Sequence, residues 1–407
     1  MSEILNNKRI IMGVTGSIAA YKSVILARLL KKAGANIDVV MSDGATRFVT
    51  PLTLKAITHQ LVMSDMYDLK SYLKINHVSL AERCDLIVIA PATANTIAKL
   101  ANGFADNPVT ATVLASRSPI IICPAMDGHM YENPVTTENV SKLKSRGFIV
   151  LGPESGELAS GLSGEGRMIE PEKILEYIKL TFGQISGDFK GLKLVVSAGG
   201  TREKLDPVRH LTNRSSGKMG YALAETARDR GADVVLVSAS KIESPVGVNF
   251  IPVDSAKDME KVVLGECVDA DILIMAAAVS DWTPVNINDQ KMKKGDEDIL
   301  EIKLVKTPDI LARLSTNNNL IKVGFAAETE NLDSNAQKKL VEKKLDIVAA
   351  NDVSLADRGF ESANNKIILF DNQGGEEDLG MLTKYQASTK ILDKIKAIMK
   401  IKSKRNR

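Results

Sequence analysis

Short apolar runs alternate with longer segments of helical periodicity along the chain. In the first half, the apolar runs have the uninterrupted, β-branched composition of buried strands; they are Arg9–Val14, Ile37–Met41, Leu86–Ala90, Ile120–Cys123 and Phe148–Leu151. Residues Tyr21–Lys32 have a helical period and are followed by Gly34, in the position of a C-terminal cap. This alternation predicts an α/β fold, with a parallel sheet covered by helices on both faces.

The same alternation resumes after a break near residue 185. A helical segment, Pro171–Phe182, is followed by the polar, glycine-containing stretch Gly183–Gly187, where we place a linker. The strands expected beyond it are Leu192–Ser197, Val234–Val237, Ile272–Met275, Lys322–Phe325, Ile347–Ala350 and Ile367–Phe370, and a closing helix runs from about Gln386 to Lys400. We therefore predict two tandem doubly wound (Rossmann-like) domains, residues 1–188 and 189–407.

Composition narrows the functional classes. The chain has 407 residues and a net charge of +3, and its only basic block, the C-terminal KIKSKRNR, is more typical of a solvated helix end than of a nucleic-acid site. No stretch approaches the roughly 18 apolar residues of a membrane span, and the N-terminus lacks the layout of a signal peptide. We expect a cytoplasmic protein without nucleic-acid or membrane partners. Cys84, Cys123 and Cys267 are far apart, which predicts reduced core thiols.

Two strand ends carry residues suited to a phosphate or a nucleotide. In Gly13–Ala19 the chain turns from a strand into a helix, exposing backbone N–H groups and a hydroxyl at the positive helix end. It is not a GxGxxG motif, and a tight turn without a ligand is the alternative. Ala90–Asn95 delivers small residues and donors to the carboxyl edge of the sheet. Together these segments favour a mononucleotide or a flavin.

Three further segments of the first half could carry chemistry. His77 stands just before a predicted helix and is suited to proton transfer near neutral pH, although a lone histidine there is more often structural. A strand is followed by the sequence PAMDGHM, which contains Asp127. The glycine-rich stretch Gly156–Arg167 is too long for a turn and predicts a mobile flap. Its Arg167 is suited to binding an anionic group, and a closing flap shields reactive intermediates from water.

These motifs resemble a known family over nearly the whole chain. GVTGSIAAYK, NHVSLA, APATANTIAKLANGFADN, PAMDGHM and GELASGLSGEGRM are similar to the flavin-dependent phosphopantothenoylcysteine decarboxylase half of the bifunctional coenzyme A biosynthesis proteins. SAGGTREKLDPVRHLTNRSSGKMG, AAAVSDW, KMKK and VGFAAET are similar to the partner half, phosphopantothenate:cysteine ligase. Ordered matches at the family's spacing are far more specific than any single motif.

For the first half, the resemblance implies FMN and a decarboxylation. FMN oxidises the substrate thiol to a thioaldehyde, which accepts the electrons left when carbon dioxide departs, and the reduced flavin then returns the hydride. His77 is implied as the acid/base. The residues implied to line FMN are Gly16, Ser17, Ile18, Ser42, Pro91, Ala92, Thr93 and Asn95.

The chain departs from the commonest family pattern at two chemically active positions. Asp127 replaces an asparagine, and Ser160 replaces a cysteine of the flap. A carboxylate facing a substrate carboxylate repels it unless protonated, and a serine hydroxyl is a much weaker acid than a thiol. We expect the half to decarboxylate with Asp127 and Ser160 in the site, with another donor, such as Ser163, Glu165 or water, supplying the final proton.

For the second half, the resemblance implies that CTP converts the carboxylate of 4′-phosphopantothenate into an acyl-cytidylate, which cysteine then attacks. Lys291, with Lys293 and Lys294, is expected to neutralise phosphate charge together with Mg²⁺, although a solvated basic loop is the alternative. Asn213 is implied to handle the intermediate, and Asp281 is implied as a metal ligand. The residues implied to contact CTP are Met275, Ala276, Ala277, Asp281, Lys291, Lys306, Thr307, Pro308, Asp309, Phe325, Lys339 and Lys343.

The resemblance also implies a homo-oligomer, because the family's flavin site is shared between subunits and its ligase half dimerises. Two rival hypotheses remain. Relatives of the first half decarboxylate peptide-terminal cysteines or prenylate flavin, and the attached ligase half argues against that chemistry here. Other relatives are regulatory subunits, against which the retained His77 argues. The prediction is thus a bifunctional enzyme that makes phosphopantothenoylcysteine and decarboxylates it to 4′-phosphopantetheine.

Overall fold

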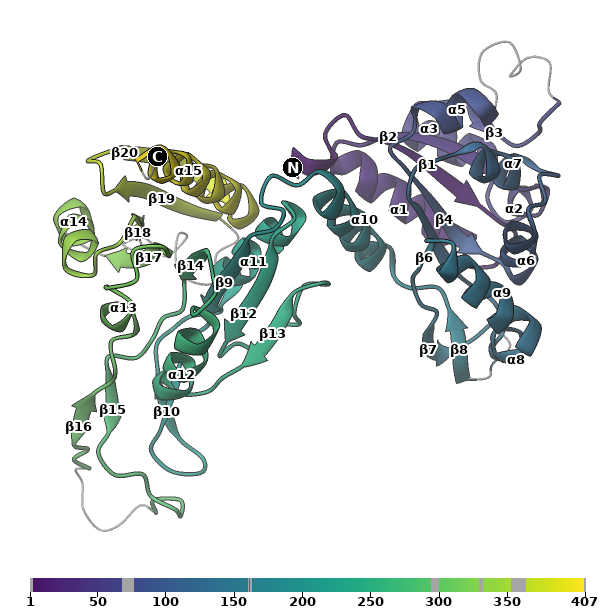
Figure 1. Ribbon diagram of the computed structural model, residues 1–407. Helices are drawn as coiled ribbons and strands as arrows, with labels where there is room; N and C mark the ends of the chain where they lie inside the picture. The colour runs from purple at the N-terminus through teal and green to yellow at the C-terminus, as the bar shows by residue number, and fades with distance from the viewer. Residues whose placement is uncertain are drawn as a thin grey trace. The chain divides into compact units, whose positions relative to one another are not determined.

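The chain forms two compact units, Met1–Lys179 and Leu180–Arg407, each built on one central sheet (Figure 1). The computed structural model describes residues 3–67, 77–159, 161, 163–293, 300–328, 332–352 and 364–405. Within these ranges, no helix combines the length and the apolar character needed to cross a bilayer.

The sheet of the first unit is parallel, with six strands in the order β3-β2-β1-β4-β5-β6. Its strands are β1 (Arg9–Val14), β2 (Asn36–Met41), β3 (Val62–Met63), β4 (Leu86–Ala92), β5 (Ile120–Pro124) and β6 (Ile149–Val150). The predicted strands are confirmed, with ends shifted by one or two residues. The order reverses between β1 and β4, which creates a switch point at their carboxyl ends.

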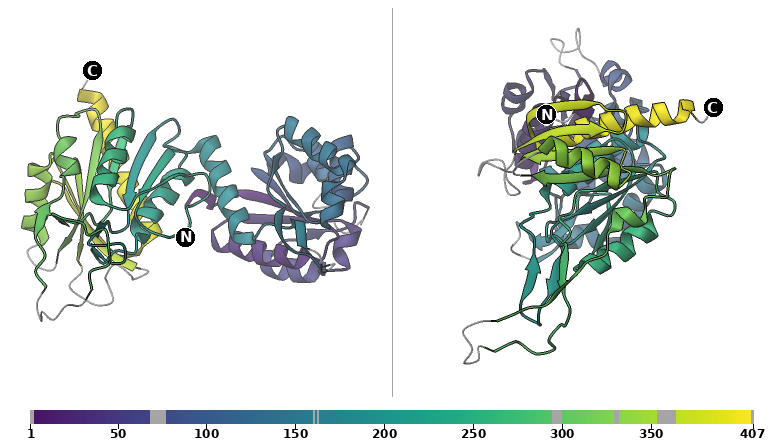
Figure 2. Two further views of the ribbon diagram at one scale, coloured as in Figure 1. Left: turned by 90° about the horizontal axis from the view of Figure 1, so that it is seen from below. Right: turned by 90° about the vertical axis from the view of Figure 1, so that its left-hand side faces the viewer.

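Helices cover both faces of this sheet, as predicted. They are α1 (Ala20–Lys32), α2 (Asp43–Thr46), α3 (Pro51–Thr58), α5 (His77–Arg83), α6 (Ala94–Asn102), α7 (Pro108–Ala115), α8 (Gly128–Glu132), α9 (Pro134–Ser145) and α10 (Pro171–Ser186). Leu80, Ile97, Val109 and Leu143 bring α5, α6, α7 and α9 into one buried cluster, and α1 lies across the other face (Figure 2). Gly34, with φ +95°, ends α1 as expected.

The second unit contains a larger sheet of eight strands in the order β13-β12-β9-β14-β17-β18-β19-β20. Its strands are β9 (Lys193–Ala198), β12 (Asp233–Ser238), β13 (Asn249–Pro252), β14 (Ile272–Met275), β17 (Ile321–Glu328), β18 (Ile347–Asp352), β19 (Asn364–Asp371) and β20 (Glu376–Thr383). The first six strands are parallel, but β19 pairs antiparallel with β18 and also with β20, to which a tight turn joins it. The wholly parallel sheet expected from the sequence is therefore corrected at this edge.

Alternating side chains of the second sheet serve two separate cores. Leu194 and Val196 point to the face covered by α11 (Lys218–Asp229) and α15 (Lys384–Arg405). Val195 points to the opposite face, covered by α12 (Ala256–Glu266), α13 (Ile310–Arg313) and α14 (Leu332–Glu342). This period of two follows from strand geometry. Two small ribbons, β10 (Arg202–Lys204) with β11 (His210–Thr212) and β15 (Trp282–Pro284) with β16 (Leu304–Lys306), extend from the sheet (Figure 1).

The stretch expected to be a linker is mostly helical. Helix α10 continues through Gly183 to Ser186 because the glycines permit close packing, and a Cβ on Gly183 would lie 2.6 Å from the Asp229 carbonyl oxygen. A Cβ on Gly187 would lie 2.2 Å from the carbonyl oxygen of Arg230. The glycine signal therefore marks contact between two backbones rather than a linker.

All three cysteines are free and buried, which confirms the prediction of core thiols. Burial raises the pKa of the Cys123 thiol, and it raises that of Cys267 to about 12. Both groups therefore stay protonated at neutral pH and are poor nucleophiles.

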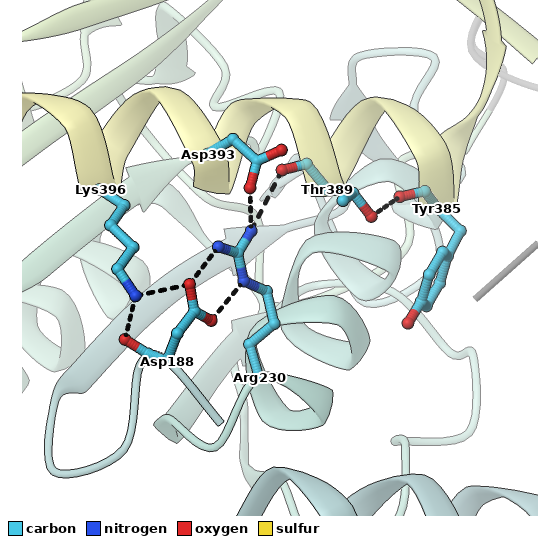
Figure 3. A network of polar contacts seen from close by, with 6 residues as sticks. All are labelled: Asp188, Arg230, Tyr385, Thr389, Asp393 and Lys396. Atoms are coloured by element: carbon cyan, nitrogen blue, oxygen red, sulfur yellow. Dashed lines mark hydrogen bonds and ion pairs between the residues drawn. The ribbon is translucent and has the colours of Figure 1, made fainter. Parts of the chain in front are cut away.

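A polar network fixes the segment after α10 to the last helix (Figure 3). The carboxylate of Asp188 accepts from Nε and Nη2 of Arg230, at 2.8 and 2.7 Å, and from Nζ of Lys396, at 2.6 Å. Arg230 also donates to Asp393 at 2.7 Å, and its guanidinium lies 4.6 Å from the ring centre of Phe189. The network joins residue 188 to α11 and α15 within the second unit.

Asp188→Asn is expected to lower the stability of this unit at neutral pH by about 1 kcal/mol, as expected for a partly exposed ion-pair network. Burial alone would raise the pKa of Asp188, but hydrogen bonds from Arg230 and Lys396 lower it to about 2. The stabilisation is therefore present above the unfolded pKa of about 3.9 and is lost as the pH falls through about 2. Denaturant titrations of both proteins between neutral pH and pH 3 would show the difference shrinking, whereas a difference independent of pH would contradict it.

Candidate active sites

The first site lies at the switch point of the first sheet, between β1 and β4. Thr15, buried directly after β1, joins the two strands: its hydroxyl donates to the Pro91 carbonyl at 2.7 Å and accepts from the Thr93 amide at 3.1 Å. The Thr93 side chain in turn accepts from the Thr96 amide, which caps the start of α6. The two strand ends therefore form one fixed edge at the place where open α/β sheets bind ligands.

Two backbone segments approach closely at this edge. A Cβ on Gly16 would lie 2.9 Å from the backbone of Gly44, so the position requires glycine. Beside them lies a cavity of about 580 Å³, lined by five of the predicted flavin residues, Gly16, Ser17, Ser42, Thr93 and Asn95. Closely spaced backbone with small hydroxyl side chains suits an anionic phosphate.

A second cavity, of about 430 Å³, shares Ser17, Ala125 and Met126 with the first and is also lined by Ile18. Its far wall is an antiparallel hairpin, β7 (Glu154–Glu157) with β8 (Ser163–Arg167), which the sequence predicted as a flap. The Gly166 carbonyl accepts from the Met126 amide at 3.0 Å, and this bond holds the hairpin against the segment that carries Asp127.

The charges around the second cavity are linked in a chain of ion pairs. Arg167, expected to meet an anionic group, donates to Glu170 at 2.6 Å, and buried Lys22 donates to the same carboxylate at 2.9 Å. These bonds lower the pKa of Glu170, and the bond from Lys22 has the largest effect. Asp127 lines this cavity, and its carboxylate accepts from the His129 amide at 3.1 Å as the cap of α8. A substrate carboxylate here would meet both a carboxylate and a guanidinium.

The other predicted residues of the first half are placed differently. Pro91 and Ala92 are buried in β4 and line neither cavity, but the Pro91 carbonyl positions Thr15. His77 is the first residue of α5 and also lines neither cavity. Ser160 lies outside the described residues.

The second site is a cavity of about 850 Å³ at the switch point between β9 and β14. It gathers Asn213 and every predicted CTP residue except Lys291; these are Met275, Ala276, Ala277, Asp281, Lys306, Thr307, Pro308, Asp309, Phe325, Lys339 and Lys343. They come from the ends of β14 and β16, the middle of β17, the start of α13 and the end of α14, with Lys343 directly after it. Phe325, expected to end a strand, is followed by three further residues of β17. The predicted grouping is thus present in one cavity.

Hydrogen bonds fix this wall. The Lys339 ammonium donates to the Phe325 carbonyl at 2.6 Å, and Lys343 pairs with Asp309. Burial alone would raise the pKa of Asp309, but the bonds from Lys343 and from the Ala312 amide keep it below its usual value. Asp309 therefore stays ionised, caps α13 and holds Lys343 at the cavity.

Asn213 lines the cavity as expected, whereas Lys291 does not. The Asn213 side-chain amide donates to the Val279 carbonyl at 3.1 Å and so fixes the loop after β14 at the cavity wall. Lys291 is exposed and lies outside the cavity lining. The next residue, Met292, donates its amide to Asp206 at 3.2 Å, which ties this loop to the turn between β10 and β11.

The polar residues of the ligase cavity that the sequence prediction did not include among the site residues include Asn351, Asn365 and Lys384. Asn351 was recognisable, because it directly follows the predicted strand Ile347–Ala350 at its carboxyl end. Asn365 and Lys384 come from the antiparallel end of the sheet, for which the sequence offered no motif.

Comparison with protein families covers both units. A model described as Flavoprotein matches residues 1–183, and one described as DNA/pantothenate metabolism flavoprotein C-terminal domain matches residues 189–399. The coenzyme A biosynthesis bifunctional protein CoaBC of Bacillus subtilis is 43% identical over 98% of each chain. That of Escherichia coli is 40% identical over 96% of this chain and 97% of its own. This chain belongs to the bifunctional coenzyme A biosynthesis family.

Membership of the bifunctional coenzyme A biosynthesis family confirms the predicted organisation, a flavoprotein decarboxylase joined to a ligase. Similar solved structures include the C-terminal domain of a CoaBC, 36% identical, which covers 53% of this chain and 99% of its own with a TM-score of 0.46. A PPC decarboxylase mutant complexed with pantothenoylaminoethenethiol is 29% identical and covers 44% of this chain and 99% of its own, with a TM-score of 0.40.

Proposed function

We propose that this enzyme catalyses two consecutive steps. CTP-dependent condensation of 4′-phosphopantothenate with cysteine is followed by FMN-dependent decarboxylation of phosphopantothenoylcysteine to 4′-phosphopantetheine. The observation that best supports the proposal is the single cavity that gathers the expected nucleotide residues, all but Lys291, at the switch point of the second sheet. The relatives similar over both units share one bifunctional name.

The ligase reaction needs a leaving group on a carboxylate. In the first step of the proposed reaction, the substrate carboxylate attacks the α-phosphorus of CTP and pyrophosphate leaves. In the second step, the cysteine amine attacks the acyl carbon and CMP leaves. Lys306, Lys339 and Lys343 bring positive charge to the cavity wall, which offsets the charge of the gathered phosphates. Asn213, fixed beside them by its bond to the Val279 carbonyl, borders the acyl centre in this proposal.

We assign the predicted Mg²⁺ to Asp281. Its carboxylate lines the cavity, and magnesium is commonly held by one or two carboxylates together with substrate phosphates. In the part of the chain that the structure describes, no three His, Cys, Asp or Glu side chains gather as a ready-made metal site. The donor set therefore fits an ion that arrives with the nucleotide and neutralises phosphate charge.

The first unit fits FMN. The close approach of Gly16 and Gly44 and the hydroxyls of Ser17 and Ser42 suit its phosphate, and the two adjoining cavities leave room for ring and substrate. When bound, the flavin supplies the two-electron acceptor that this decarboxylation requires. Arg167 and Lys22 bring positive charge to the second cavity, which Asp127 also lines.

His77 requires a second copy of the chain in this proposal. It lies outside both cavities of its own unit, so we propose that a neighbouring subunit completes the flavin site with its acid/base. A homo-oligomer in the cytoplasm remains the predicted form of the enzyme.

The function is tested by giving the purified chain 4′-phosphopantothenate, cysteine and CTP, and measuring carbon dioxide and product. We expect 4′-phosphopantetheine. Because a thiol is a better proton donor than a hydroxyl, Ser160→Cys should raise the decarboxylation rate by about tenfold and leave ligation unchanged. Asp127→Asn, which removes the repelling carboxylate, is assayed in the same way. Accumulation of phosphopantothenoylcysteine would leave only the ligase, and absence of both products would overturn the proposal.

A further inference from the structure

The lining of the ligase cavity includes polar residues that the predicted nucleotide residues do not explain. Lys384 begins α15, Asn365 lies at the start of β19 and Asn351 lies near the end of β18. Antiparallel pairing of β18 with β19 and of β19 with β20 brings these positions to the same edge of the sheet. All three residues line the cavity, as do Lys218 and Met219 of α11.

Lys384 presents a buried ammonium group that no carboxylate of the described residues compensates. The residue is only 8% exposed, and its ammonium donates to the side-chain oxygen of Asn365. An ammonium has three donors, and no second acceptor for it is found among the described residues. Burial, together with the nearby Lys218 ammonium, lowers the pKa of Lys384 to about 8. No described carboxylate offsets this cost, so an anion in the cavity would be held strongly.

Asn351 supplies an independent sign of a missing ligand. It is 7% exposed, and its Oδ1 has no hydrogen-bond partner in the described ranges of the chain. A buried polar atom without a partner is costly, so such an atom facing a cavity indicates a group from outside the chain. Rotation of the side-chain amide exchanges Oδ1 for Nδ2, which lets the same residue donate to an anionic oxygen.

The start of α11 completes the wall. This helix has 12 residues, and its N-cap, Gly217, has φ +82° and no side chain, while the Lys218 amide donates to Oγ of Ser216 at 3.5 Å. The first-turn residues Lys218, Met219 and Gly220 all line the cavity. Helix α15 differs, because Thr383 and Gln386 cap its first turn through reciprocal hydrogen bonds. Thus α11 offers backbone donors at its positive end, and α15 offers the Lys384 side chain.

We propose that Lys384 binds a phosphate group of a ligase substrate, together with Asn351 and the first-turn amides of α11. Asn365 is a positioning residue, because it touches the ammonium of Lys384 and holds it toward the cavity. This proposal rests on the proposed ligase function. Two substrates carry such a group, CTP with its triphosphate and 4′-phosphopantothenate with its phosphomonoester, and calorimetric titration distinguishes them.

Calorimetric titrations of the full-length chain test the assignment, with CTP, cytidine and 4′-phosphopantothenate as separate probes. Lys384→Met is expected to weaken the binding of one of the two phosphate-bearing probes by at least about tenfold. Cytidine, which has no phosphate, should bind unchanged, and Lys384→Arg, which keeps the charge, should restore part of the affinity. The matched control is Lys390→Met, because Lys390 is an exposed lysine on the same helix.

The probe whose binding is weakened in Lys384→Met identifies the substrate that supplies the phosphate. The KM of the variant for the same substrate should rise by a similar factor. Unchanged binding of both phosphate-bearing probes to Lys384→Met would overturn the proposal. So would an equal loss of cytidine binding, because that would show a distorted cavity. Failure of the proposed function is distinguishable, because the unmodified chain would then form no phosphopantothenoylcysteine whatever the affinities of the variants.

Discussion

Gly166→Ala is expected to remove most of the decarboxylase activity and to leave the ligase activity unchanged. A Cβ at this position would lie 2.2 Å from the Met126 carbonyl oxygen and 3.2 Å from the Gly128 amide nitrogen. Either the hairpin or the backbone of residues 126–128 must therefore move. The movement would break the bond between the Met126 amide and the Gly166 carbonyl, which holds the hairpin over the second cavity. Since misplacement by about 1 Å can cost a hundredfold in rate, we expect a loss of about that size.

The matched control is Gly164→Ala, on the same strand. A Cβ there meets only ordinary contacts, at 3.8 Å, so decarboxylation should stay close to that of the unmodified enzyme. Carbon dioxide release from phosphopantothenoylcysteine and CTP-dependent ligation are measured on the same preparations. Equal decarboxylation by both alanine variants would show that the contact of the hairpin with Met126 does not support the reaction.

Arg228→Met is expected to destabilise the ligase unit by roughly 3–5 kcal/mol, the usual cost of leaving one member of a buried ion pair without its partner. Arg228 is fully buried and donates to Asp229 Oδ1 from Nε at 3.0 Å and from Nη2 at 2.6 Å. It also donates to the Val246 carbonyl at 2.8 Å. Methionine fills much of the space but leaves the Asp229 carboxylate buried and short of donors.

Denaturant unfolding followed by loss of ligase activity measures this effect. Lys338→Met, which breaks an exposed ion pair with Glu342 in the same unit, should cost less than about 1 kcal/mol. Tyr385→Phe removes one hydrogen bond to Asp229, of 2.7 Å, and should fall between the two. Similar losses for Arg228→Met and Lys338→Met would mean that the buried pair contributes no more than a surface pair.

The sequence predicted the central strands well because they are apolar on both faces. Leu86–Ala92 is buried throughout, and such runs are conspicuous between polar helices. The edge strand β20, by contrast, is mostly exposed and reads Glu-Glu-Asp at its start, so no apolar pattern marks it. Strand β3, with two residues, is too short for any periodicity. Local pattern therefore located the core but not the margins of the sheets.

The candidate sites show the same division. Residues just after apolar strands, such as Ser17, Thr93 and Ala276, line cavities at the sheet edges, because a motif links each of them to its strand. Lys384 was missed because only the antiparallel pairing of the last strands brings it to the cavity. His77 carries a motif, but its position relative to a cavity depends on packing that spacing does not encode.

The packing of α10 limits how this polypeptide can be divided by gene fission or by protein engineering. Its last turns belong physically to the ligase: Gly183 and Gly187 lie against the backbone of Asp229 and Arg230, and the Leu180 side chain lies against Gly247. A ligase that started at residue 189 would expose the carbonyls and the apolar surface that these turns cover. A separation that preserves the ligase as a folded enzyme must therefore cut before Leu180 and leave the end of this helix on the downstream product.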